Sequence, residues 1–90
     1  MYRILIVEDD AGIAEAVSEQ AKMWNFETHS VTNFRNVMAE FAEFDPHLVL
    51  MDIGLPFFNG YYWCSEIRKV SRVPVIFISS ASDNMNIVMA

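Results

Sequence analysis

The order of apolar and amphipathic segments in this 90-residue chain predicts an α/β fold, a doubly wound parallel sheet with helices on both faces. Short apolar runs rich in β-branched residues alternate with segments whose apolar residues recur at helical spacing. The runs Arg3–Val7 and His47–Met51 are apolar almost throughout, which is typical of strands covered on both faces. Both runs end abruptly in acidic residues, and in such sheets the functional groups gather at the carboxyl ends of the strands.

Two more strands complete the expected sheet. Phe26–Val31 alternates well enough to be a strand, and Val73–Ile78 is a buried-looking run whose Pro74 is tolerable near its start. Strands are therefore expected at 3–7, 26–31, 47–51 and 73–78, with a helix after each of the first three. Met85–Ala90 has the pattern of the first turns of a fourth helix.

The helices have recognisable ends and apolar faces. Asp10 is well placed as the first N-cap, because the helix dipole favours its carboxylate. Thr32 is expected to cap the second helix, and Asp45 with Pro46 breaks it. The residues expected on the apolar faces are Ile13, Val17, Ala21 and Trp24, then Phe34, Val37, Met38 and Phe41, and finally Trp63, Ile67 and Val70. Of these, we expect Trp24, Phe41 and Trp63 to lie in or near the core.

Charge and composition exclude several classes of protein. Six Lys plus Arg stand against twelve Asp plus Glu, a net charge of −6, which argues against nucleic-acid binding by this segment alone. Cys64 is the one cysteine, so an internal disulfide framework and a cysteine-based zinc site are excluded, and a reducing cytoplasm fits. No apolar run is long enough to span a bilayer, and the length fits one domain.

Acidic side chains follow two of the expected strands. Glu8, Asp9 and Asp10 come after the first strand, and Asp52 comes after the third. If these strands are neighbours, Asp9 and Asp52 lie close together, and clustered carboxylates raise one another's pKa unless a cation neutralises them. An all-oxygen site favours a hard ion such as Mg²⁺. The acidic run alone is better explained as a solvated loop or a helix start, but its convergence with Asp52 favours a metal site.

Other phosphate-handling motifs are absent from the sequence. It contains no Gly-x-Gly-x-x-Gly and no Gly-rich loop ending in Lys-Ser or Lys-Thr. Haloacid dehalogenase phosphatases carry a general acid two residues after their nucleophilic Asp, and here that position is Gly54. We therefore expect Asp52 to accept a phosphoryl group without rapid turnover, and we do not expect an enzyme.

Three separated motifs resemble the receiver domain of bacterial two-component response regulators. They are Ile6–Asp10, Asp52–Gly60 and Val73–Ser80, in the family's order and spacing. More narrowly, Tyr62-Trp63-Cys64 and Ser79-Ser80 resemble OmpR/PhoB-type cell-envelope-stress regulators of Gram-positive bacteria. The resemblance implies a flavodoxin-like (CheY-like) sheet with strand order 2-1-3-4. It also implies transcription regulation in the cytoplasm, with DNA bound only through an output domain outside this chain.

The resemblance also assigns roles to individual residues. Asp52 would be the phosphoacceptor for a sensor histidine kinase. Asp9 would bind Mg²⁺ directly and Glu8 mainly through water, with Asp52 and the carbonyl of Gly54 completing the protein ligands. Ser79 would supply the switch hydroxyl, and the backbone N–H of Ser80 would help to hold the phosphoryl group. Taken alone, a hydroxyl satisfying a helix start explains Ser79 as well.

We expect residues 1–90 to form a receiver domain truncated after the start of its fourth helix, without the family's fifth strand and fifth helix. The family's fifth strand carries a Lys that pairs with the phosphoryl group and an aromatic residue that moves with the switch hydroxyl. Their absence from residues 1–90 keeps a second interpretation open, a protein-interaction module with the receiver shape and no switch. An uncovered edge on the strand at 73–78 predicts a homodimer or higher assembly. The aromatic pair Phe57-Phe58 is either a lid packed on the third helix or a partner-contact patch, and packing is favoured.

Overall fold

The computed structural model describes residues 1–78 and 87–89. Its elements are β1 (Arg3–Val7), α1 (Ala11–Met23), β2 (Glu27–Ser30), α2 (Val37–Phe44), β3 (Leu48–Asp52), α3 (Gly60–Arg68), β4 (Val75–Ile78) and β5 (Ile87–Met89). They form one sheet in the order β2-β1-β3-β4-β5, and the first four strands are parallel. The predicted α/β class and the order 2-1-3-4 are confirmed.

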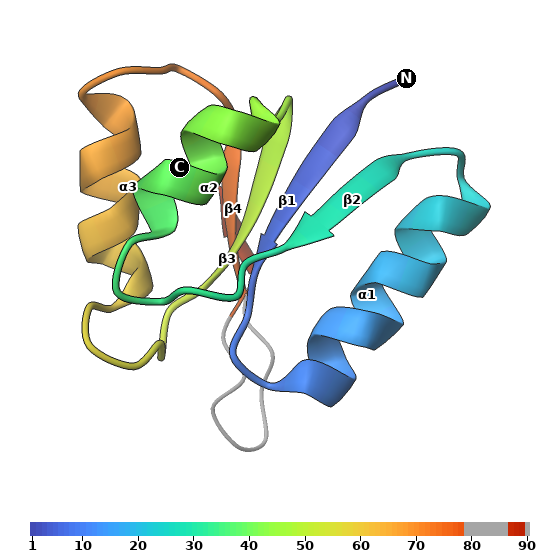
Figure 1. The fold of residues 1–90 in the computed structure, drawn as a ribbon, viewed down its shortest axis with the longest axis horizontal. Coiled ribbons are helices and arrows are strands. Elements are labelled where there is room, and N and C mark those ends of the chain that lie inside the picture. Colours follow the sequence, from blue (N-terminus) through green and yellow to red (C-terminus); the bar gives the residue numbers. More distant parts are fainter. Residues whose placement is uncertain (79–86, 90) are drawn as a thin grey trace.

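The helices cover the two faces of the sheet, with α1 on one side and α2 and α3 on the other (Figure 1). Side chains of β1 alternate between the two cores, so Ile4 and Ile6 pack under α1 while Leu5 and Val7 pack under α2 and α3. All four are buried, as expected for a strand covered on both faces. Within the described residues, no helix combines the length and the apolar character needed to cross a membrane.

The last described segment corrects the sequence prediction. Ile87–Met89, expected within a helix over Met85–Ala90, is a short strand that pairs antiparallel with β4, Phe77 opposite Val88. An edge strand has unpaired N–H and C=O groups, and a β-branched segment of the same chain satisfies some of them. The prediction of an uncovered β4 edge, on which the expected assembly depended, is therefore wrong over these residues.

Two helix predictions are also corrected. The second helix begins at Val37, where the Asn36 side chain accepts from the Ala39 N–H, and not at the predicted cap Thr32. Trp24 is 74% exposed because it follows the end of α1, whereas Phe41 and Trp63 are buried as predicted. The predicted cap Asp10 is confirmed, since its Oδ1 accepts from the N–H groups of Gly12 and Ile13.

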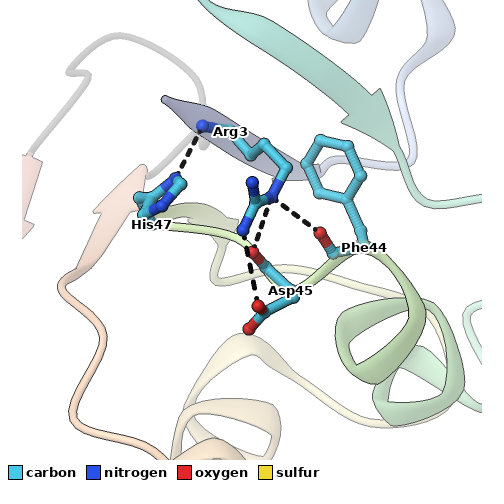
Figure 2. Close-up of polar contacts among 4 residues, drawn as sticks. All are labelled: Arg3, Phe44, Asp45 and His47. Atoms are coloured by element: carbon cyan, nitrogen blue, oxygen red, sulfur yellow. Dashed lines mark hydrogen bonds and ion pairs between the residues drawn. The ribbon is translucent and has the colours of Figure 1, made fainter. Parts of the chain in front are cut away.

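Arg3 ties the amino end of β1 to the end of α2 (Figure 2). Its Nε donates to the carbonyl oxygens of Phe44 and Asp45 at 3.0 and 2.8 Å, and its Nη2 lies 3.4 Å from Asp45 Oδ2. The backbone N–H of Arg3 donates to His47 Nδ1 at 2.9 Å. Asp45 has a left-handed φ of 51°, which ends the helix just before Pro46. This polar cluster lies at the opposite end of the strands from the acidic residues.

Candidate metal centre

The pairing of β1 with β3 brings the acidic residues together. Val7 is opposite Met51 in this parallel pair, so Glu8, Asp9 and Asp52 leave the sheet at the same edge. Each of these three residues offers a carboxylate oxygen, and the three oxygens lie within 4.8 Å of one another. The predicted convergence is confirmed.

Glu8 is the electrostatically most perturbed of the three. Its Oε2 accepts from the Asp10 N–H at 3.1 Å, whereas its Oε1 is buried and accepts no hydrogen bond from a donor. Burial, together with the neighbouring Asp52 and Asp9 carboxyls and against the opposing Asp10 N–H, raises the pKa of Glu8 from 4.5 to about 7. The carboxyls of Glu8 and Asp52 can share a hydrogen bond only when one of them holds a proton.

Asp52 ends β3 in a buried position, 2% exposed. Its Oδ1 accepts from the Gly54 N–H at 3.1 Å, so the following loop turns back on the carboxylate. Helix α3 begins against the same point, and a Cβ on Gly60 would lie 2.4 Å from the carbonyl oxygen of Asp52. The lack of a side chain at Gly60 is therefore what lets the helix begin this close to the acidic residue.

The loop between Asp52 and α3 is held by aromatic contacts. Phe58 stacks on Tyr62 at 4.4 Å and meets Trp63 edge-on at 5.5 Å, so packing on α3 is confirmed for this residue. Phe57 is 61% exposed and has a φ of 68°, a strained value for a bulky side chain. The Arg35 guanidinium lies over its ring, 4.1 Å from the centroid.

A cleft of about 610 Å³ opens onto Glu8 and Asp9. One wall is the polar face of α1, including Glu15 and Lys22, and the other is the segment after β2. Three converging carboxylates, one with a buried oxygen that lacks a donor, form a donor set that fits a hard divalent cation. The geometry thus supports the predicted Mg²⁺ ligands Glu8, Asp9 and Asp52.

The remaining predicted site residues divide into two groups. Gly54 lies beside Asp52 and contributes its N–H, while Ser79 and Ser80 lie outside the described residues. Arg35, which covers the Phe57 ring, had no signal in the sequence, because it belongs to no motif and its contact depends on a turn whose geometry periodicity does not predict.

The chain matches the family model described as "Response regulator receiver domain" over residues 4–90. It is 48% identical over 90 residues to the "Uncharacterized transcriptional regulatory protein YvcP" of Bacillus subtilis, and this match covers all of the chain and 38% of that protein. The chain thus spans well under half the length of this relative.

Solved structures agree with this match. The N-terminal domain of the nisin resistance regulator NsrR superposes with a TM-score of 0.84 and 45% identity, covering 96% of this chain and 73% of that one. The response regulator TrrA of Thermotoga maritima was solved in complex with Mg²⁺ and a beryllium fluoride. It superposes with a TM-score of 0.82 and 29% identity, covering 91% of this chain and 72% of TrrA. TrrA solved in complex with the histidine kinase ThkA superposes with a TM-score of 0.81 and 28% identity, covering 92% of this chain and 72% of TrrA.

Proposed function

This chain belongs to the response regulator receiver domain family, and on that premise we propose that it accepts a phosphoryl group on Asp52 from a histidine kinase in a Mg²⁺-dependent reaction. The observation that carries the proposal is the convergence of Glu8, Asp9 and Asp52 within 4.8 Å, with one buried carboxylate oxygen left without a donor. Such a cluster is unfavourable on its own and becomes favourable when a cation balances it.

The reacting group of this chain in the transfer is the Asp52 carboxylate. A carboxylate oxygen of Asp52 forms a bond to phosphorus while the bond from phosphorus to the donor's imidazole nitrogen breaks, and the imidazole leaves with the electron pair. The Gly54 N–H holds Oδ1 of Asp52, which orients the carboxylate before the attack. Asp52 itself is nearly fully buried, and the cleft opens onto its neighbours Glu8 and Asp9.

Glu8, Asp9 and Asp52 would hold the Mg²⁺ ion, with the carbonyl of Gly54 as the further protein ligand implied by the family. When bound, this ion would neutralise the carboxylates and the charge that develops on the phosphoryl oxygens. At a pKa of about 7, Glu8 is only partly ionised at neutral pH, and it would carry its full charge once the cation offsets the burial and the neighbouring carboxyls that raise this pKa. Ser79 and Ser80 would meet the phosphoryl group from the end of β4.

We propose acceptance without rapid turnover, so the domain acts as a switch and not as an enzyme. Position 54 is a glycine, and a Cβ built there would meet no atom within 4 Å. No acid is therefore placed two residues after Asp52 to assist hydrolysis of the acyl phosphate.

The receiver would act within a longer transcription regulator. YvcP is named a transcriptional regulatory protein, and TrrA was solved with a histidine kinase, which supports a sensor histidine kinase as partner and a DNA-binding output domain in the longer protein. We propose a cytoplasmic location for this protein. The acidic charge of −6 agrees with DNA contact through another domain. Self-association stays a prediction, without the free β4 edge as its argument, and sedimentation velocity tests it.

The test is labelling of the intact protein with phosphoramidate and Mg²⁺, followed by mass spectrometry. We expect one added phosphoryl group in the wild type and in the control Asp45→Asn, an exposed aspartate far from the site, and none in Asp52→Asn or after chelation of the metal. Labelling that persists in Asp52→Asn would refute the assignment. A receiver-shaped interaction module without a switch would instead show no Mg²⁺-dependent NMR shifts at Asp9 and Asp52.

A further inference from the structure

The segment Val31–Asn36, which links β2 to α2, lies between two hollows of the surface. On one side it forms a wall of the cleft that opens onto Glu8 and Asp9, through residues that include Thr32 and Phe34. On the other side Thr32 also lines a separate hollow of about 460 Å³ beside α2. The position of this segment therefore sets the width of the acidic cleft.

Glu40 of α2 holds the segment from the second hollow. Its carboxylate accepts from the Asn33 N–H at 2.9 Å and from the Thr32 N–H at 3.2 Å, and His29 Nε2 lies 2.7 Å from its Oε1. The Glu40 side chain is only 16% exposed. One side chain on a helix thus fixes two consecutive backbone amides that have no partner in a helix or a strand.

The same segment also reaches the loop that follows Asp52. The Asn33 side chain accepts from the Arg35 N–H at 3.0 Å, which fixes the position of the Arg35 backbone. The Arg35 guanidinium then covers the ring of Phe57, whose φ of 68° is unfavourable for a bulky side chain. A continuous set of contacts leads from Glu40 through Asn33 and Arg35 to the acceptor loop.

We infer that Glu40 is a positioning residue for phosphorylation: it holds the Val31–Asn36 segment that walls the acidic cleft and, through Arg35, keeps Phe57 and the acceptor loop in place. The inference rests on the proposed function of Asp52. Glu40 touches neither the metal ligands nor the acceptor, so its effect on phosphorylation passes entirely through this segment.

The charge of Glu40 suits this role. Burial alone would raise the pKa of Glu40, but the Asn33 N–H, the His29 ring and the Thr32 N–H together lower it below its ordinary value. The carboxylate is therefore ionised at neutral pH, and hydrogen bonds to an ionised acceptor are stronger than those to a neutral one. Glu43, on the same helix and lining the same hollow, makes none of these bonds and is a matched control.

The test measures the initial rate of phosphorylation of the intact protein by phosphoramidate at saturating Mg²⁺, together with the amide NMR shifts of Phe57 and Gly60. We expect Glu40→Ala to lower the rate about three- to tenfold, less than the roughly hundredfold effect of a 1 Å misplacement at the reacting atoms. Glu43→Ala should keep the wild-type rate. Arg35→Ala should lower the rate in the same direction, and the conservative Arg35→Lys should restore most of it because a cation stays over the ring.

The double variant Glu40→Ala/Arg35→Ala should be no slower than the slower single variant, because both substitutions break one set of contacts. Rate losses that multiply would overturn the inference, as would a wild-type rate with unmoved Phe57 and Gly60 shifts in Glu40→Ala. If Glu40→Ala does not fold, the exposed Arg35→Ala decides, since a wild-type rate there removes the proposed route to the loop. A wild-type protein that is not labelled refutes the phosphoacceptor function itself, whereas a labelled wild type with unaffected variants refutes the role of Glu40 alone.

Discussion

Substituting Gly60 by alanine tests the closeness of α3 to the acidic residue at the end of β3. An added Cβ would lie 2.4 Å from the Asp52 carbonyl oxygen and 2.9 Å from Met51 Cγ. The first of these atoms belongs to the backbone of a central strand, so it cannot rotate away. To restore an ordinary contact of about 3.4 Å, the helix start or the strand end must shift by about 1 Å, since 3.4 − 2.4 = 1.0.

Forcing an extra methyl group into a packed site costs about 1–3 kcal/mol. The exchange of glycine for alanine in a helix returns about 0.5–1 kcal/mol through backbone entropy. We therefore expect the free energy of unfolding of Gly60→Ala to fall by about 1–2 kcal/mol. The shift also moves the Asp52 carboxylate, so phosphorylation should slow even where the protein remains folded.

Urea unfolding followed by circular dichroism measures the change, and Gly54→Ala is the control. A Cβ at position 54 meets nothing within 4 Å, and no glycine of the described chain has a positive φ. Both variants restrict the unfolded chain in the same way, so their difference isolates the collision at Gly60. Equal stability of the two variants would show that α3 does not press on the end of β3, and the reasoning would fail.

Three further predictions concern charged side chains. Glu8→Gln removes a charge beside Asp52, so calorimetry should show a more stable metal-free protein and a smaller stabilisation by Mg²⁺; an unchanged Mg²⁺ response would contradict Glu8 as a ligand. Arg3→Gln removes the guanidinium contacts drawn in Figure 2 and should cost about 1–2 kcal/mol in urea unfolding, against less than about 0.5 for the exposed Arg72→Gln. The pKa of Glu40 is lowered from 4.5, so the stabilisation by its carboxylate is complete above pH 4.5 and is lost as the pH falls through the lower pKa of the folded state. The free energy of unfolding of Glu40→Gln should therefore fall less steeply with acid than that of the wild type. Identical acid profiles would argue against the hydrogen bonds to this carboxylate.

The fold and the acidic centre could be predicted because both depend on strong local patterns. A strand covered on both faces must be apolar throughout, so β1 and β3 are visible in the sequence. Parallel neighbours end at the same edge of the sheet, so Glu8, Asp9 and Asp52 could be placed together before their distances were known.

The rest depended on competition between equivalent local signals. Thr32 and Asn36 are both suitable N-caps, and in the structure the Asn36 side chain caps α2 while the Thr32 N–H donates to the Glu40 carboxylate. Trp24 fits the helical period but follows the last turn of α1, where the helix no longer faces the sheet. The short β5 arises from pairing with β4, a contact that a six-residue apolar segment does not specify by itself.

The opposite exposures of the two tryptophans give the domain a pair of optical reporters. Trp24 is 74% exposed and Trp63 is 4% exposed, so a soluble quencher such as acrylamide will quench the fluorescence of Trp24 first. The remaining emission comes from an indole whose ring meets Phe58 at 5.5 Å and Tyr62 at 4.9 Å. Displacement of the loop after Asp52 would change the surroundings of that ring, and the unlabelled protein would report it as a shift in emission wavelength in real time.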